Sequence, residues 1–144
     1  MQMFTFTVPG KIKGKARPRV LKSGFSYTPK ETVQYENWIK MCYREAQGEH
    51  HEQAVQVTID AQFDRPKNHY RTGKNSAMLR DDAPHWHTAR PDGDNIAKCV
   101  CDSLNGLAWK DDSLVSKLSI NKSYSSDHQE RLVVYIDVLT WFDC

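Results

Sequence analysis

Carboxylate side chains are concentrated in one part of the chain. Five of the eighteen lie in the 23 residues from position 90 to position 112. Asp92 and Asp94 stand next to a proline and a glycine, so we expect them in a turn or extended segment, where residues two apart lie about 6.5–7 Å from each other. Asp111 and Asp112 open a later alternating segment. Hard oxygen ligands from a turn and a strand start are what a Mg²⁺ or Mn²⁺ site for phosphate chemistry requires.

A helical pattern follows the first acidic pair. Apolar residues recur at spacings of four, four and three, and a glycine falls where a helix C-terminus favours a left-handed residue. These positions are Ile96, Val100, Leu104, Gly106 and Leu107. The pattern predicts a helix over residues 94–105. Asp94 and Lys98 are four apart and are therefore neighbours on its surface, which places a cation beside the carboxylates.

Two simpler explanations of the acidic residues have to be weighed. An aspartate at a helix start can serve only as an N-cap, and this alternative stays open. A calcium loop of the EF-hand type is excluded. If Asp92 were its first ligand, Ile96 would hold the fifth position and Ala97 the place that requires glycine.

Two histidines precede the acidic motif, at His85 and His87. A zinc site that combines them with Cys99 and Cys101 is disfavoured, because the cysteines are two apart on a predicted helix, about 200° around its axis. If residues 85–88 form a strand, Trp86 points away from the histidines and is buried. His87 either contacts the scissile phosphate or caps the strand, and both alternatives stay open.

Three separated motifs resemble the signature of RusA-like Holliday junction resolvases. They read Arg90-Pro-Asp-Gly-Asp-Asn-Ile-Ala-Lys98, Asp102-Ser-Leu-Asn-Gly106 and Asp111-Asp-Ser-Leu-Val115. The stretch from Val8 to Arg19 and Tyr27-Thr-Pro-Lys30 are also similar to that family, so the likeness extends from about residue 6 to residue 138. Three motifs in order are far more specific than a lone pair of aspartates.

The resemblance implies a small, homodimeric, metal-dependent endonuclease that cuts four-way DNA junctions. Its metal-binding carboxylates would be Asp92, Asp94 and Asp112, holding Mg²⁺ or Mn²⁺, and its active-site lysine would be Lys98. Asp111 is the alternative third ligand, because the spacing before this pair varies among relatives.

Outside the ligand set, Asn95 could brace a ligand carboxylate, as outer-shell groups commonly do. Asp102 is either a partner of Lys98 or a surface residue.

Basic residues are also unevenly distributed. Residues 9–30, the basic arm, hold seven lysines and arginines and no acid, whereas the rest of the chain holds thirteen basic and eighteen acidic residues. Cations occupy every second position of its first half: Lys11, Lys13, Lys15, Arg17 and Arg19. In an extended segment these cations would lie on one face, and the distance between neighbouring cations would be close to the distance between phosphates along a DNA strand. We expect the arm, together with Arg90, to bind DNA; a solvated loop or a lysine-guarded edge strand is the alternative.

Periodicity predicts the remaining elements. Alternating residues indicate strands over 4–8, 54–63, 114–124 and 131–138, and an apolar stripe indicates a helix over 29–47. That stripe comprises Tyr35, Trp38, Ile39, Cys42 and Ala46, and Thr28 with Glu31 would form its capping box. The strand at 114–124 would bury Leu114, Leu118, Ile120 and Tyr124. We interpret residues 64–89 as a mobile loop that orders on DNA.

The order of elements predicts one α+β domain over residues 1–144, with a mixed sheet of four or five strands and two main helices packed on it. Nothing approaches the roughly 18 apolar residues of a membrane helix, and the alternating start is unlike a signal peptide. The cysteines, at 42, 99, 101 and 144, form no disulfide framework, which suits the cytoplasm of a bacterium or of a phage host.

The acidic residues and the basic arm favour phosphodiester hydrolysis, and the resemblance to RusA-like resolvases implies that the substrate is the four-way junction of DNA, in recombination and repair. A non-catalytic DNA-binding domain, in which only the arm acts, is one alternative. A metal-dependent nuclease for flaps or single-stranded DNA is the other.

Overall fold

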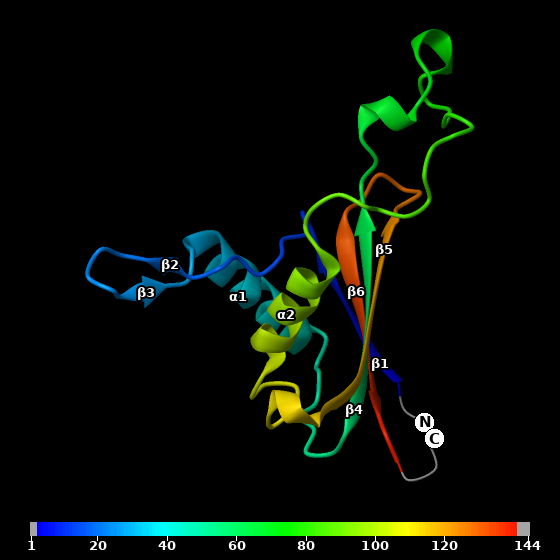
Figure 1. Ribbon diagram of the computed structural model, residues 1–144. Coiled ribbons are helices and arrows are strands. Elements are labelled where there is room, and N and C mark those ends of the chain that lie inside the picture. Colours follow the sequence, from blue (N-terminus) through cyan, green and yellow to red (C-terminus); the bar gives the residue numbers. More distant parts are fainter. Residues whose placement is uncertain (1–2, 141–144) are drawn as a thin grey trace.

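A mixed four-stranded sheet carries two helices on one of its faces in the computed structural model, which describes residues 3–140 (Figure 1). The strands are β1 (Met3–Pro9), β4 (Val55–Phe63), β5 (Val115–Tyr124) and β6 (Arg131–Val138), in the order β1-β6-β4-β5. The helices are α1 (Lys30–Glu45) and α2 (Gly93–Leu104). The predicted α+β class, mixed sheet and helix pair are therefore confirmed.

Only β4 and β5 pair in parallel, while β1 with β6 and β6 with β4 are antiparallel. A second sheet of two short strands, β2 (Arg19–Val20) and β3 (Ser26–Tyr27), projects from the body as a hairpin (Figure 1). The sequence reading missed this hairpin, because strands of two residues show no period. No helix within residues 3–140 is long and apolar enough to cross a membrane.

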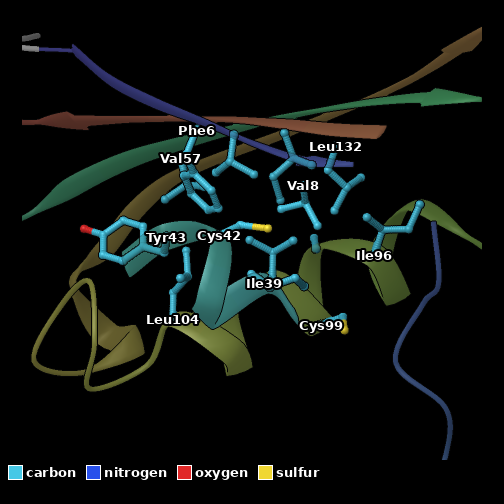
Figure 2. Packing of buried hydrophobic residues seen from close by; sticks show 14 of the residues in the cluster. Phe6, Val8, Ile39, Cys42, Tyr43, Val57, Ile96, Cys99, Leu104 and Leu132 are labelled. Carbon is cyan, nitrogen blue, oxygen red and sulfur yellow. The ribbon is translucent and has the colours of Figure 1, made fainter. Parts of the chain in front are cut away.

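The core lies between the sheet and the helices. Every second residue of β4 is buried, from Val55 to Phe63. Figure 2 shows Val57 and Leu132 of the sheet facing Ile39 of α1 and Ile96 of α2. Each such side chain contributes about 1.5–3 kcal/mol on burial, and truncating one of them, as in Ile39→Ala, would cost about 2–5 kcal/mol.

The first helix differs from its prediction at its edge and at its start. Trp38 was predicted in the core stripe but is 38% exposed, and its indole N–H donates to the Pro9 carbonyl at 2.8 Å. Tyr43 fills the core instead, and Ala46 lies outside the helix and is exposed. The capping box is absent. Pro29, in an extended conformation, is the N-cap, and no side chain caps the helix.

Two further side chains predicted to be buried are exposed. Leu118 is 48% exposed, because β5 is an edge strand and α2 covers it near Ile120. Trp86 is 58% exposed, since residues around it form only a single bridge, with Ser123 of β5. Both predictions assumed that alternation alone shows which side chains of a strand are covered by the neighbouring elements.

Candidate active site

The first turn of α2 carries the first acidic pair. Asp92 is the N-cap residue, with an extended backbone (φ −69°, ψ 148°), and its side chain makes no capping hydrogen bond. Asp94 lies in the first helical turn, where the helix dipole favours a negative charge. Both residues are exposed, and neither carboxylate has a hydrogen bond or ion pair within residues 3–140. The explanation of Asp92 as a simple cap therefore fails.

Strand β5 fixes the position of this turn. A Cβ on Gly93 would lie 3.5 Å from Ile120 and 3.8 Å from the Lys122 side chain. The Lys122 ammonium donates to the Ala89 carbonyl at 2.7 Å. The sequence reading missed Lys122 as a cation near the acidic pair. Its signal was a lysine at a position of β5 where the alternation of Ile120 and Tyr124 calls for an apolar residue.

Lys98 follows Asp94 by one turn, and α2 spans both, so they are helical neighbours as the spacing predicts. Lys98 is exposed and has no partner among the described side chains. The Asn95 side chain makes no hydrogen bond to a carboxylate within residues 3–140; its backbone carbonyl accepts from the Lys15 amide at 2.9 Å.

The second acidic pair lies at the opposite end of α2. Asp112 begins the short 3-10 helix η3 (Asp112–Leu114), and its Oδ1 accepts from the Trp109 indole at 2.8 Å. Asp111 accepts from the Ser113 amide at 3.0 Å, and hydrogen bonds from Ser113 hold the pKa of this carboxyl below its ordinary value. Burial, then the charges of Asp112 and Asp102, raise the pKa of Cys101 to about 12. Asp112 thus lies beside the last turn of α2.

The three predicted carboxylate ligands are not gathered into one group. Within residues 3–140, no set of three or more histidine, cysteine, aspartate or glutamate side chains is placed to hold a metal ion. Mg²⁺ in phosphate chemistry is commonly held by one or two carboxylates with waters and substrate phosphates. The unpartnered pair Asp92 and Asp94 suits that donor set, whereas a three-aspartate cage in a single chain does not fit.

The basic arm crosses the start of α2. A Cβ on Gly14 would meet the Cβ atoms of Asn95 and Pro91 at 3.0 and 3.1 Å, so this close passage requires glycine. Ile12 is buried in the core and anchors the arm to the body of the domain.

Lys15 is held away from solvent. Its ammonium lies 3.2 Å from both carboxylate oxygens of Glu36 on α1 and 3.3 Å from Asp102 on α2. Burial lowers the pKa of Lys15, but hydrogen bonds and attraction from Glu36 and Asp102 outweigh it and raise the pKa above its ordinary value. Lys15 is thus engaged by two carboxylates, although it also lines the hollow beside Asp92, and its contact with DNA stays a prediction. Asp102 pairs with Lys15 and not with Lys98.

The other cations of the arm border two connected hollows. One, of about 850 Å³, is lined by Lys11, Lys13, Arg17, Arg19 and Lys30 among others. The second, of about 580 Å³, is lined by Arg17, Arg90, Asp92 and Asn95 among others, and Pro91 and Gly14 border both. None of these cations has an ion pair within the described residues. A polyanion lying along the arm would therefore bring a phosphate close to the Asp92 carboxylate.

His87 lies on the segment before Asp92, and its amide donates to the Lys122 carbonyl of β5 at 3.0 Å. Its ring stacks on Phe63, with centroids 3.5 Å apart and planes 8° from parallel. Burial, followed by repulsion from Lys122, lowers the pKa of His87 below its ordinary value. Its Nδ1 is buried without a partner in the described chain. His85 packs edge-on against Trp86.

Unpartnered carboxylates beside a cation-lined hollow suit an enzyme of the phosphodiesterase class. The family model described as Endodeoxyribonuclease RusA matches residues 9–137, which include the arm and both acidic pairs. The chain belongs to this family of endonucleases, which act at Holliday junctions and bind branched DNA. It is also 27% identical over 143 residues to a Bacillus subtilis (strain 168) protein named Uncharacterized protein YqaN, covering 93% of this chain and 96% of that protein.

Proposed function

We propose that this chain is a divalent-metal-dependent endodeoxyribonuclease that resolves four-way DNA junctions as a homodimer, in recombination and repair in the bacterial cytoplasm. The observation that carries the proposal is the pair of unpartnered carboxylates, Asp92 and Asp94, of which Asp92 lines a hollow bordered by Arg17 and Arg90. Family membership supports junction DNA as the substrate.

Asp92 and Asp94 would hold Mg²⁺ or Mn²⁺, and Asp112 joins them in the proposal through the family motif alone. When bound, the ion polarises the phosphoryl oxygens and lowers the pKa of a bound water. Asp112 has a second task in this chain, since it accepts the hydrogen bond of the buried Trp109 indole.

The remaining residues bind and orient the DNA. Lys11, Lys13, Arg17, Arg19 and Arg90 attract the phosphate backbone and set its register along the arm. Lys98, one turn along α2, offsets negative charge that develops on the scissile phosphate. Lys122 is tied to the Ala89 carbonyl and so fixes the segment that leads into Asp92.

A four-way junction presents two equivalent strands, and resolution requires one cut in each. The chain contributes one Asp92 and Asp94 pair, so a two-fold homodimer whose axis matches that of the junction supplies both cuts. A heterodimer of wild-type and tagged Asp94→Asn chains should then nick one strand and seldom complete resolution. Full resolution by that heterodimer would contradict the paired-site arrangement.

The decisive experiment compares labelled four-way, flap and duplex DNA, each with the purified protein, with Mg²⁺ and with a chelator. We expect Mg²⁺-dependent paired cuts in the four-way junction and little cleavage of the other substrates. Preferred cleavage of flaps would support the flap-nuclease alternative. Binding to all substrates without cleavage under any metal would support a non-catalytic DNA-binding domain.

A further inference from the structure

The long connection after β4 is a folded arch and not a featureless loop. It contains two 3-10 turns, η1 (Lys67–His69) and η2 (Gly73–Asn75). The Arg71 amide donates to Met78 at 2.8 Å and the Arg80 amide to His69 at 2.9 Å, which closes a small antiparallel loop. The arch extends past the end of the sheet (Figure 1).

A cavity of about 570 Å³ lies between this arch and the sheet end. Tyr70 and Leu79 line it from the arch, and Gln62, Tyr124 and Ser125 line it from the sheet side. Ser125 is only 8% exposed, and its hydroxyl has no hydrogen-bond partner within residues 3–140. A buried polar group without a partner costs free energy, and such groups in native proteins need an explanation. A ligand that supplies the missing hydrogen bond provides one.

The charged groups around this cavity already have partners. The Arg131 guanidinium binds both oxygens of Asp127, at 2.7 and 3.1 Å. Arg65 donates to the Pro84 carbonyl at 2.8 Å and lies over the Tyr124 ring, 4.9 Å from its centroid. His128 lies 3.7 Å from Asp64. The groups of the cavity that remain available to a ligand are therefore uncharged, namely aromatic rings, hydroxyls and an amide.

The backbone below the cavity adopts a costly conformation. His128 has φ of 60°, in the left-handed region that non-glycine residues seldom occupy. Its ring lies 5.8 Å from that of Tyr70, tilted by 31°, and the Tyr70 hydroxyl is 3.4 Å from its Nδ1. Strained residues of this kind gather at ligand clamps, where surrounding contacts hold them. The contacts between His128 and Tyr70 form an aromatic wall of the cavity.

The cavity adjoins the candidate active site along β5. Lys122 bonds to Ala89, three residues before Asp92, and Tyr124 follows Lys122 by two residues, about 6.5–7 Å along the strand. A DNA strand that is cut beside Asp92 and continues along β5 would pass the mouth of the cavity.

We propose that this cavity binds one unstacked nucleobase of the DNA substrate, next to the cut, and so determines which sequence is cleaved. The inference rests on the proposed function. Tyr70 supplies a ring face for stacking, which tolerates any base, and Ser125 with Gln62 supplies hydrogen bonds that distinguish one base from another. The branch point of a junction is where a base leaves its stack at least cost.

The first test uses photochemical crosslinking. Junctions that carry 5-iodouracil in place of single thymines around the branch are bound to the Asp94→Asn chain, irradiated and mapped by mass spectrometry. We expect crosslinks to Tyr70 or Tyr124. A junction that binds but crosslinks only to the basic arm overturns the cavity while leaving the proposed function intact. A chain that binds no junction overturns both.

The second test measures cleavage across junctions that differ in the bases around the cut. Ser125→Ala should reduce the difference in rate between best and worst sequence by about tenfold, and Tyr70→Leu should weaken binding by about the same factor, as expected for one stacked base. The exposed Ser119→Ala, on β5 outside the cavity lining, serves as the control and should leave both unchanged. An unaltered sequence preference in Ser125→Ala together with unaltered affinity in Tyr70→Leu would overturn the proposal.

Discussion

The two ends of α2 hold the same type of side chain in opposite circumstances. At the start of the helix, Asp92 and Asp94 are exposed and make no hydrogen bond or ion pair within residues 3–140. Beyond its end, Asp111 accepts from Ser113 and Asp112 accepts from the buried Trp109 indole. A carboxylate without a partner is available to a cation or a substrate, whereas one bonded to the core contributes to folding. The first pair is therefore available for binding, whereas the hydrogen bonds of the second pair support the local fold.

The largest expected effect comes from the first pair. Asp94→Asn should lower the cleavage rate by about a thousandfold or more, roughly 4 kcal/mol of transition-state stabilisation, because it removes a ligand charge. Stability should change by less than about 0.5 kcal/mol, since the side chain is exposed. Gel assays of junction cleavage and urea denaturation measure the two quantities. Wild-type cleavage by Asp94→Asn would remove the first pair from the chemistry.

Two substitutions of Asp112 distinguish a structural role from a catalytic one. Asp112→Ala should destabilise the fold by about 1–3 kcal/mol, because the buried Trp109 N–H loses its acceptor. Asp112→Asn keeps an oxygen for that bond and should be nearly as stable as wild type. Cleavage by Asp112→Asn then tests the family motif by itself: a wild-type rate would make Asp112 a structural residue only.

Lys15 and Lys13 give a matched pair on the arm that crosses α2. Lys13→Gln should lower the slope of log affinity against log salt by about one unit, since a phosphate contact is lost. Lys15→Gln should leave the slope unchanged and instead cost about 1 kcal/mol of stability, because Glu36 and Asp102 lose their partner while solvent screens part of the loss. Salt-dependent binding and urea denaturation distinguish them. Equal salt effects in both variants would return Lys15 to the DNA contacts.

The smallest effect is expected at Asp111. Its pKa is held below the ordinary value of 3.8, chiefly by Ser113. The carboxylate therefore contributes stability that is present above pH 3.8 and is lost as pH falls through the lowered pKa. Asp111→Asn should cleave at the wild-type rate, and its small stability difference from wild type should vanish in acid unfolding experiments. A loss of cleavage would instead make Asp111 the third ligand.

Periodicity predicted the parts of the fold in which one face is fully covered. β4 alternates without a break and is buried on one face along its whole length, and the stripe of Ile96 and Val100 marks the buried side of α2. The wrong predictions concern residues at the border of a covered face, such as Trp38 and Leu118. Spacing places a residue on a face but does not show how far the neighbouring element extends over it.

The same limit applies to the site residues. The motif placed Asp92, Asp94 and Lys98 correctly at the start of α2, because helical spacing alone decides their positions. The role of Lys15 depended on Glu36 and Asp102, 21 and 87 residues away. Alternation of charge carries no information on such distant partners, and it therefore predicts the same DNA contact for every cation of the arm.

The main sheet contains no hairpin between strands that follow each other in sequence, and this has a kinetic consequence. The shortest connection between paired residues joins Val55 to Val115, 60 positions apart, and β1 pairs with β6 at still greater separation. Each strand pairing must therefore close a long loop before contacts repay its entropy. Folding dominated by such non-local contacts takes about milliseconds to seconds. Asp92 and Asp94 lie inside the connection between β4 and β5, so the site is complete only after this 60-residue loop has closed. In stopped-flow refolding, binding of junction DNA should appear no earlier than the burial of Trp109.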